Sequence, residues 1–281
     1  MIILLHVLVA AIYATTAWLR WPRAAVRAPA GVAQALLALA LILHAIAISR
    51  AIVGPGGLDL SFVNALSLVA GLAVLAAWLT GVLRTLPGVA AVVLPVAAVC
   101  ALLPPLAESP HRVAFAGDPW AGVHIGVALV AYALFVVVAL QALVMTGLEK
   151  RLHSGHPGAA ASATPPLLTL ERYMFRLLTV GFVLLTLTLA SGMLFSEELF
   201  GTPATFTNKI VFTVAGWVAF AVLLFGRWRY GWRGRTALKW ILAGTLLLVL
   251  GYLGSKFVRE VVLGSETTYW SDFSQGTQPF Q

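Results

Sequence analysis

The chain is a succession of long apolar runs separated by short stretches rich in Arg, Lys, Pro and Gly. A helix needs about 20 predominantly apolar residues to cross the hydrocarbon core of a bilayer. Eight runs approach or reach this length, and we predict membrane-spanning helices at about 2–19, 31–49, 62–83, 88–106, 121–147, 173–195, 209–226 and 237–257. The pattern therefore predicts an all-α, polytopic membrane protein.

The composition supports this interpretation. Hydrophobic residues make up 60% of the 281 residues and charged residues only 10%, against about 25% charged in an ordinary soluble domain. The first run carries its basic residues after the apolar stretch, unlike a signal peptide, so we predict that it is retained as a helix. Since no shift in composition marks a second domain, residues 1–281 are predicted to form one transmembrane helical domain.

The basic residues predict which ends of the helices face the cytoplasm. Thirteen of the 18 Lys and Arg residues fall in one set of alternate connections, and the other five fall in the other set. Because cytoplasmic loops carry the excess of Lys and Arg, the richer set is predicted to be cytoplasmic. The linker at 148–172 is then cytoplasmic and the tail at 258–281 is outer. Both termini are therefore predicted on the outer side of the membrane.

The net charge of +8 does not indicate a nucleic-acid-binding protein, because the cations sit in short clusters between apolar runs. The densest cluster, GRWRYGWRGRTALKW at 226–240, mixes five cations with Trp and Tyr, which is typical of a loop at the lipid headgroups. The lipid bilayer is therefore the first expected partner. The single cysteine, Cys100, lies within an apolar run and offers neither a disulfide nor a thiolate metal site.

Four of the six histidines are predicted to gather toward the outer side. His6 lies near the start of the first run, His44 lies in the outer half of the second, and His124 opens the fifth from outside. His111 lies in an outer connection. At about 1.5 Å per residue, His44 would lie roughly 8 Å below the outer end of its helix. Ionisable side chains within spans are costly and usually face a bundle interior or a wet cavity, so His44 and His124 are the first candidates for a site.

An imidazole in such a place suits several chemistries. It can ligate haem iron, carry protons near neutral pH or bind another transition metal, and it can also simply hydrogen-bond a neighbouring helix. The predicted spans contain no Asp or Glu, which disfavours a coupled ion transporter. No set of catalytic residues is evident, and we favour a protein that is not an enzyme.

Three parts of the chain resemble the cytochrome c assembly protein family, which includes CcsA/ResC and the shorter HemX and YpjD-type inner-membrane proteins. They are LILHAIAISRAIVGPGGLDLSFVNALSLVAG at 41–71, HIGVALVAYALF at 124–135, and the long stretch that begins ERYMFRLLTVGF at 171 and ends GYLGSKFV at 258. The resemblance covers nearly the whole chain, and the eight-span YpjD-type branch fits it best. It implies a location in a bacterial inner membrane, with both termini on the periplasmic side.

The resemblance implies haem handling at an outward-facing site between helices. His44, followed by Arg50, is similar to the family's first in-membrane histidine, and His124 is similar to its first outer-face histidine. Both are thereby candidate axial ligands of a non-covalently bound, b-type haem. Trp120, four residues before His124 on the same helical face, would wall a planar ligand or belong to the interfacial aromatic belt. His6 completes the candidate cofactor-binding residues.

The chain also departs from the family pattern. The segment SEELFGTPATFTNKIVF at 196–212 contains no tryptophan, whereas the family has a tryptophan-rich segment that cradles haem there. The second histidine of each pair is absent, near LLFGRWRYG and near GYLGSKFV. These departures keep a second hypothesis open: a membrane accessory or scaffold protein that binds a transporter or another protein of cytochrome c biogenesis.

Overall fold

The computed structural model describes residues 2–20, 29–54, 57–106, 112–113, 119–153, 166–194, 208–254 and 257. His111 and the predicted outer tail at 258–281 lie outside these residues. The helices of the described part are α1 (Ile2–Leu19), α2 (Ala30–Ile52), α3 (Phe62–Leu79), α4 (Val82–Thr85), α5 (Pro87–Leu102), α6 (Pro119–His153), α8 (Leu167–Leu194), α10 (Asn208–Tyr230) and α11 (Gly234–Val249). The short 3₁₀ helix η1 (Pro104–Leu106) follows α5, and the π-helical turn η2 (Leu250–Gly254) follows α11.

Eight stretches of helix are long and apolar enough to cross a membrane. They are Ile2–Leu19, Gly31–Ile52, Phe62–Leu79, Pro87–Leu106, Trp120–Lys150, Leu167–Met193, Lys209–Tyr230 and Gly234–Gly254. Within the described part of the chain, the prediction of a helical, polytopic membrane protein with eight spans is confirmed.

Several helices differ from the predicted spans by a few residues at their ends, and α6 continues to His153, six residues into the predicted linker. α3 ends at Leu79, because the nearby Gly81 adopts a left-handed conformation (φ 74°) that breaks the helix before the single turn α4. α8 begins at Leu167, so the last residues of the predicted linker at 148–172 are helical and continuous with the sixth span.

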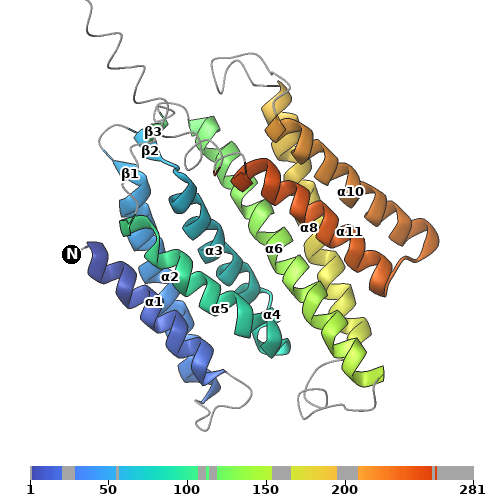
Figure 1. Ribbon diagram of the computed structural model, residues 1–281, viewed down its shortest axis with the longest axis horizontal. Helices are drawn as coiled ribbons and strands as arrows, with labels where there is room; N and C mark the ends of the chain where they lie inside the picture. The colour runs from blue at the N-terminus through green and yellow to red at the C-terminus, as the bar shows by residue number, and fades with distance from the viewer. Residues whose placement is uncertain are drawn as a thin grey trace, which may run out of the picture.

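A small antiparallel sheet, which the sequence pattern does not predict, lies at one end of the bundle (Figure 1). β1 (Val53–Gly54), β2 (Gly57–Asp59) and β3 (Arg112–Val113) pair in that order. Strands of two or three residues are too short to show the apolar and polar alternation by which strands are predicted. We call this end of the bundle the sheet end; α6 begins there and α8 ends there (Figure 1).

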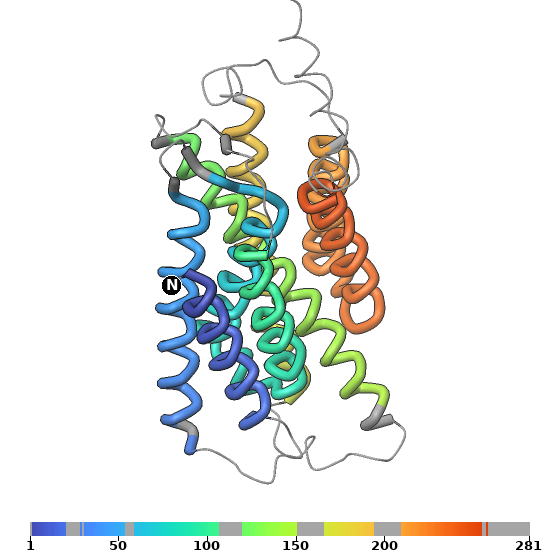
Figure 2. Tube along the Cα trace, turned by 60° about the vertical axis from the view of Figure 1, so that its left-hand side comes forward, coloured from blue at the N-terminus to red at the C-terminus, as the bar shows by residue number. Residues whose placement is uncertain are grey.

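α6 lies between two groups of helices, with α1 to α5 on one side and α8, α10 and α11 on the other (Figure 1, Figure 2). Its Ala133 and Val137 side chains pack into the buried core formed with the first group, whereas Phe135 and Val138 pack into the core of the second group. At 3.6 residues per turn these pairs point to different sides of the helix. α6 is therefore shared by two apolar cores.

Glycines let α10 and α11 approach each other closely. A Cβ atom at Gly244 would lie 2.8 Å from the ring of Phe220, and one at Gly216 would lie 2.9 Å from Leu248. Phe220 in turn stacks on Phe135 of α6, with ring centroids 4.2 Å apart. Small residues of this kind bring membrane helices together and increase their van der Waals contact.

Candidate functional site

His44 is 2% exposed and is hydrogen-bonded at both ring nitrogens. Its Nδ1 lies 3.2 Å from the hydroxyl oxygen of Tyr13 on α1, and its Nε2 lies 3.0 Å from that of Ser67 on α3. A neutral imidazole has one N–H donor and one acceptor nitrogen, so one hydroxyl donates to the ring and the other accepts from it. His44 thus joins α1, α2 and α3 through a buried polar chain.

An apolar groove of about 380 Å³ runs between α2 and α3 and reaches His44. Its remaining lining residues are Ala38, Leu41, Ile42, Ala45 and Ile48 of α2, and Leu68, Gly71, Leu72, Leu75 and Trp78 of α3. Gly71 leaves room for the imidazole, since a Cβ atom there would lie 3.0 Å from Nδ1. The groove falls within the range of about 300–1,000 Å³ that small-molecule sites occupy.

His124 is partly buried near the start of α6 and faces α8. Its Nδ1 lies 2.7 Å from Oγ of Ser191, whose hydroxyl donates to the carbonyl oxygen of Thr188 at 3.2 Å. In the tautomer that is protonated at Nδ1, the imidazole donates to the serine oxygen while the serine proton stays on the Thr188 carbonyl, and the lone pair of the ring is on Nε2. Metal-ligating histidines usually have this arrangement, in which a hydrogen bond holds one nitrogen and orients the other.

Three further residues define the surroundings of His124. A Cβ atom at Gly192 would lie 3.3 Å from Cε1 of the imidazole, so the glycine allows α8 to approach the ring. The ammonium group of Lys209, at the start of α10, acts electrostatically on His124 and lies 5.5 Å from the centre of the Tyr252 ring. Trp120, one turn before His124, is 74% exposed. This region combines an oriented imidazole, a cation and an exposed aromatic side chain.

The two predicted ligands face different spaces between helices. His44 is bonded to residues of α1 and α3, whereas His124 is bonded to α8. Ile125, the residue after His124, instead packs against the buried cluster of Ile48, Ile52 and Leu60. The hydrogen bonds of the two imidazoles therefore go to different helices.

His6, the third candidate histidine, lies in neither position. It is fully buried on α1, and its Nδ1 donates to the carbonyl oxygen of Ala101 near the end of α5 at 2.7 Å. It lines a separate cavity of about 150 Å³, which is below the usual range of about 300–1,000 Å³ for small-molecule sites.

The partners of the histidines, Tyr13, Ser67 and Ser191, are not identified from the sequence. Hydroxyl side chains are common in apolar runs, and these three lie 31, 23 and 67 residues from the histidine that each contacts. Only the packing of the helices brings these groups within hydrogen-bond distance.

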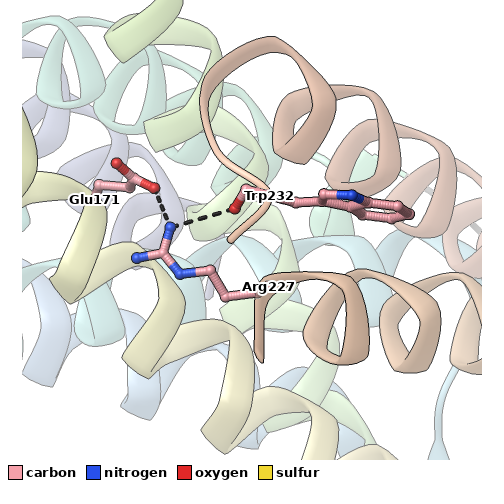
Figure 3. A network of polar contacts seen from close by, with 3 residues as sticks. All are labelled: Glu171, Arg227 and Trp232. Carbon is pink, nitrogen blue, oxygen red and sulfur yellow. Dashed lines mark hydrogen bonds and ion pairs between the residues drawn. The ribbon is translucent and has the colours of Figure 1, made fainter. Parts of the chain in front are cut away.

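The sequence also does not predict a polar network that lies at the end of the bundle opposite the sheet end. Figure 3 shows Arg227 of α10 paired with Glu171 of α8 while it donates to the carbonyl oxygen of Trp232 at 3.3 Å. The guanidinium also lies 4.2 Å from the ring centre of Phe175. The sequence contains one indication of this pair, because Glu149 and Glu171 are the only acidic residues in the predicted cytoplasmic connections.

Comparison with known proteins agrees with the resemblance seen in the sequence. The chain matches the Cytochrome C assembly protein family over residues 32–263. It is 33% identical over 231 residues to inner membrane protein YpjD of Escherichia coli (strain K12), which covers 80% of this chain and 85% of YpjD. It is 28% identical over 185 residues to cytochrome c biogenesis protein CcsA of Prochlorococcus marinus (strain AS9601), which covers 59% of this chain and 60% of CcsA.

No solved structure was found to match the chain. The family match covers far more than half of the residues, and the similarity to YpjD extends over most of both proteins. The predicted resemblance is therefore confirmed, and the chain belongs to the cytochrome c assembly protein family.

Proposed function

We propose that this protein binds a b-type haem non-covalently at an outward-facing site between α6 and α8, with His124 as an axial ligand. The proposal rests on the hydrogen bond of 2.7 Å between His124 Nδ1 and Ser191 Oγ, which orients the ring so that, with the proton on Nδ1, Nε2 would ligate iron. A neutral imidazole held in this way is a ready ligand for haem iron. A relative of this chain, CcsA, is named as a cytochrome c biogenesis protein, which agrees with a role in haem handling.

The residues around His124 fit the shape and charge of haem. Trp120 is one turn away on the same helical face and would lie against a planar macrocycle. Lys209 places a cation near the imidazole, where it would attract a haem propionate. When bound, haem supplies an iron centre whose properties depend on its axial ligand and on the surrounding hydrogen bonds. The protein's contribution is to hold, orient and partly shield that group.

His44 is the proposed ligand of a second, deeper haem position. The apolar groove of about 380 Å³ beside it suits a largely apolar macrocycle. Ligation through Nε2 would replace the hydrogen bond with Ser67, while Tyr13 would retain its bond with Nδ1. Ligation by His44 therefore requires the loss of one of its two hydrogen bonds within the protein.

The setting of the proposed function is a bacterial inner membrane, with both termini on the periplasmic side. The similar protein YpjD is named as an inner membrane protein. Thirteen of the 18 Lys and Arg residues lie in the connections assigned to the cytoplasm. In this orientation the sheet end faces the periplasm, so that His124 and Trp120 lie on the outer side.

A second candidate function is a membrane accessory or scaffold protein for a transporter or another protein of cytochrome c biogenesis. It is favoured by the geometry of His44, both of whose nitrogens are already hydrogen-bonded within the protein. A histidine satisfied in this way is explained by its role in joining three helices. Under this function the chain keeps the family fold and binds a membrane protein instead of haem.

An absorption spectrum of the detergent-purified protein distinguishes the two functions. The protein is made in cells supplied with a haem precursor, and spectra are recorded in the oxidised and the dithionite-reduced states. We expect a Soret band that shifts on reduction, is lost or strongly reduced in His124→Ala and is unchanged in the control His153→Ala. A band unchanged in His124→Ala would overturn the assignment of this ligand. A folded protein that does not bind haem in a stoichiometric amount would support the accessory function.

A further inference from the structure

A small polar cavity of about 150 Å³ lies where α1, α2, α3, β2 and η1 meet. Its polar side chains come from His6, Asp59, Ser61 and Asn64, and the lining is completed by Ile2, Ala51, Val63, Pro104 and Pro105. None of these residues belongs to the groove beside His44 or contacts His124 among the interactions described above. The cavity is thus a feature that the proposed haem function does not use.

His6 faces this cavity with a defined protonation pattern. Its Nδ1 lies 2.7 Å from the carbonyl oxygen of Ala101, and a carbonyl oxygen can only accept a hydrogen bond. Nδ1 therefore carries the proton of the neutral ring, and Nε2 carries the lone pair. Nε2 is buried and has no hydrogen-bond partner among the described residues.

The other polar groups of the cavity are also rich in acceptors. Ser61 is 1% exposed, and its hydroxyl oxygen is likewise buried without a partner in the described part of the chain. The backbone N–H of Ser61 donates to Oδ1 of Asp59 at 3.0 Å, and the Asn64 side-chain nitrogen donates to the Asp59 carbonyl oxygen at 3.0 Å. Since Asn64 uses its nitrogen there, its amide oxygen is left as an acceptor, as is the second carboxylate oxygen of Asp59.

We propose that this cavity binds a divalent first-row transition-metal ion through Nε2 of His6 and oxygen atoms of Asp59, Ser61 and Asn64. Buried acceptors without partners are rare in native proteins, so a group from outside the chain is expected to satisfy them. One imidazole nitrogen with carboxylate, hydroxyl and amide oxygens is a ligand set for such ions. The carbonyl that accepts from Nδ1 of His6 gives the support that metal-ligating histidines usually have.

The ligand set also predicts that the ion exchanges readily. Among the residues that the structure describes, no three His, Cys, Asp or Glu side chains form a group that could hold a metal. The site instead depends on one nitrogen, one carboxylate and neutral oxygen atoms. Neutral oxygens attract a divalent ion less strongly than charged ligands do, so we expect reversible binding rather than a permanent structural ion.

Metal binding to the full-length protein tests the proposal. The protein is purified in detergent without a histidine tag, treated with a chelator and titrated with Zn²⁺ or Co²⁺, with bound metal measured after gel filtration. We expect one ion per chain in this site. Binding should be weakened about 10-fold or more in His6→Gln and in Asp59→Asn, which remove a nitrogen ligand and the charge respectively. The control His153→Asn, at the far end of α6, should leave the affinity for this ion unchanged.

The outcomes separate this proposal from the haem proposal. If His6→Gln does not fold, Asp59→Asn and Ser61→Ala test the same cavity by changing oxygen ligands only. Retention of the Soret band in Asp59→Asn together with loss of the metal would show two independent sites. Affinity that is the same in the parent, His6→Gln and Asp59→Asn, or the absence of stoichiometric metal in the folded parent, would mean that the cavity holds water only and would overturn the proposal.

Discussion

The Nδ1 atom of His124 lies 2.7 Å from the hydroxyl oxygen of Ser191, which itself donates to the carbonyl oxygen of Thr188. This chain of two hydrogen bonds links the imidazole on α6 to α8 and suits the tautomer that is protonated at Nδ1. It orients a polar side chain near the start of an apolar helix. The hydroxyl of Ser191 is therefore as relevant to the proposed site as the histidine that it positions.

Replacement of Ser191 by alanine is expected to weaken haem binding about 10–100-fold, because Nδ1 loses its acceptor and the ring loses its orientation. A haem titration followed at the Soret band measures this change, and Ser191→Thr, which keeps the hydroxyl, should restore most of the affinity. Ser49→Ala is the matched control, since the exposed Ser49 hydroxyl bonds only to the carbonyl of Ile46 in its own helix among the contacts described. Equal affinity in Ser191→Ala and the parent would show that this hydrogen bond does not support the ligand.

Replacement of Ser67 by alanine is expected to have the opposite effect at the deeper position. Ser67 competes with iron for Nε2 of His44, so its removal should increase the amount of haem bound there. The comparison is best made in a His124→Ala background, in which the outer ligand is absent. A stoichiometric haem titration measures the result. If Ser67→Ala binds no more haem than its background, His44 is not a ligand and its role is to join helices.

Replacement of Tyr13 by phenylalanine is expected to lower the free energy of unfolding by about 1–3 kcal/mol, because it leaves a buried imidazole nitrogen without its partner. Tyr13 is fully buried, and its hydroxyl lies 3.2 Å from His44 Nδ1. Denaturant unfolding in detergent measures the loss. Tyr173→Phe, at a residue that is 50% exposed, is the control and should change stability little. Similar stabilities for the two variants would contradict the proposed link between α1 and α2.

Replacement of Glu171 by glutamine is expected to lower the free energy of unfolding by about 1–3 kcal/mol, a value between those for exposed and buried ion pairs. The side chains of Arg227 and Glu171 are 23% and 13% exposed, and the pair ties α8 to the turn between α10 and α11 (Figure 3). Thermal unfolding in detergent is measured for Glu171→Gln, Arg227→Gln and the double variant. Together the three variants give the coupling energy between the two residues. Arg229→Gln changes a neighbouring exposed cation and serves as the control. Additive effects of the two single variants would show that the pair contributes no coupling energy.

The orientation in the membrane can be tested because the sequence has only one cysteine, Cys100. In a Cys100→Ser background, a new cysteine at Ser271 in the predicted outer tail should react in intact spheroplasts with a reagent that does not cross membranes. A cysteine at Ser154, in the predicted cytoplasmic linker, should react only after the membrane is opened. The reverse pattern would place both termini in the cytoplasm and turn the proposed haem site inward.

Much of the architecture follows from the sequence alone, because the length of an apolar run is a direct consequence of bilayer thickness. The eight spans and the family follow from runs and motifs that are local in the chain. The buried position of His44 follows from the cost of exposing an imidazole to lipid, whereas the burial of His6, so near the start of the chain, does not follow from the sequence. The small sheet does not follow, since its longest strand has three residues and its pairing depends on distant segments.

The partner of each histidine is decided only by the tertiary structure. In a membrane helix nearly every face is apolar, so the periodicity that identifies the buried face of a soluble helix is weak. The rotation and depth of each helix are set by packing against its neighbours. Those two quantities determine that His44 meets Tyr13 and Ser67, and that His124 meets Ser191. A hydrogen bond requires its atoms to be within about 3 Å, a precision that apolar patterning does not encode.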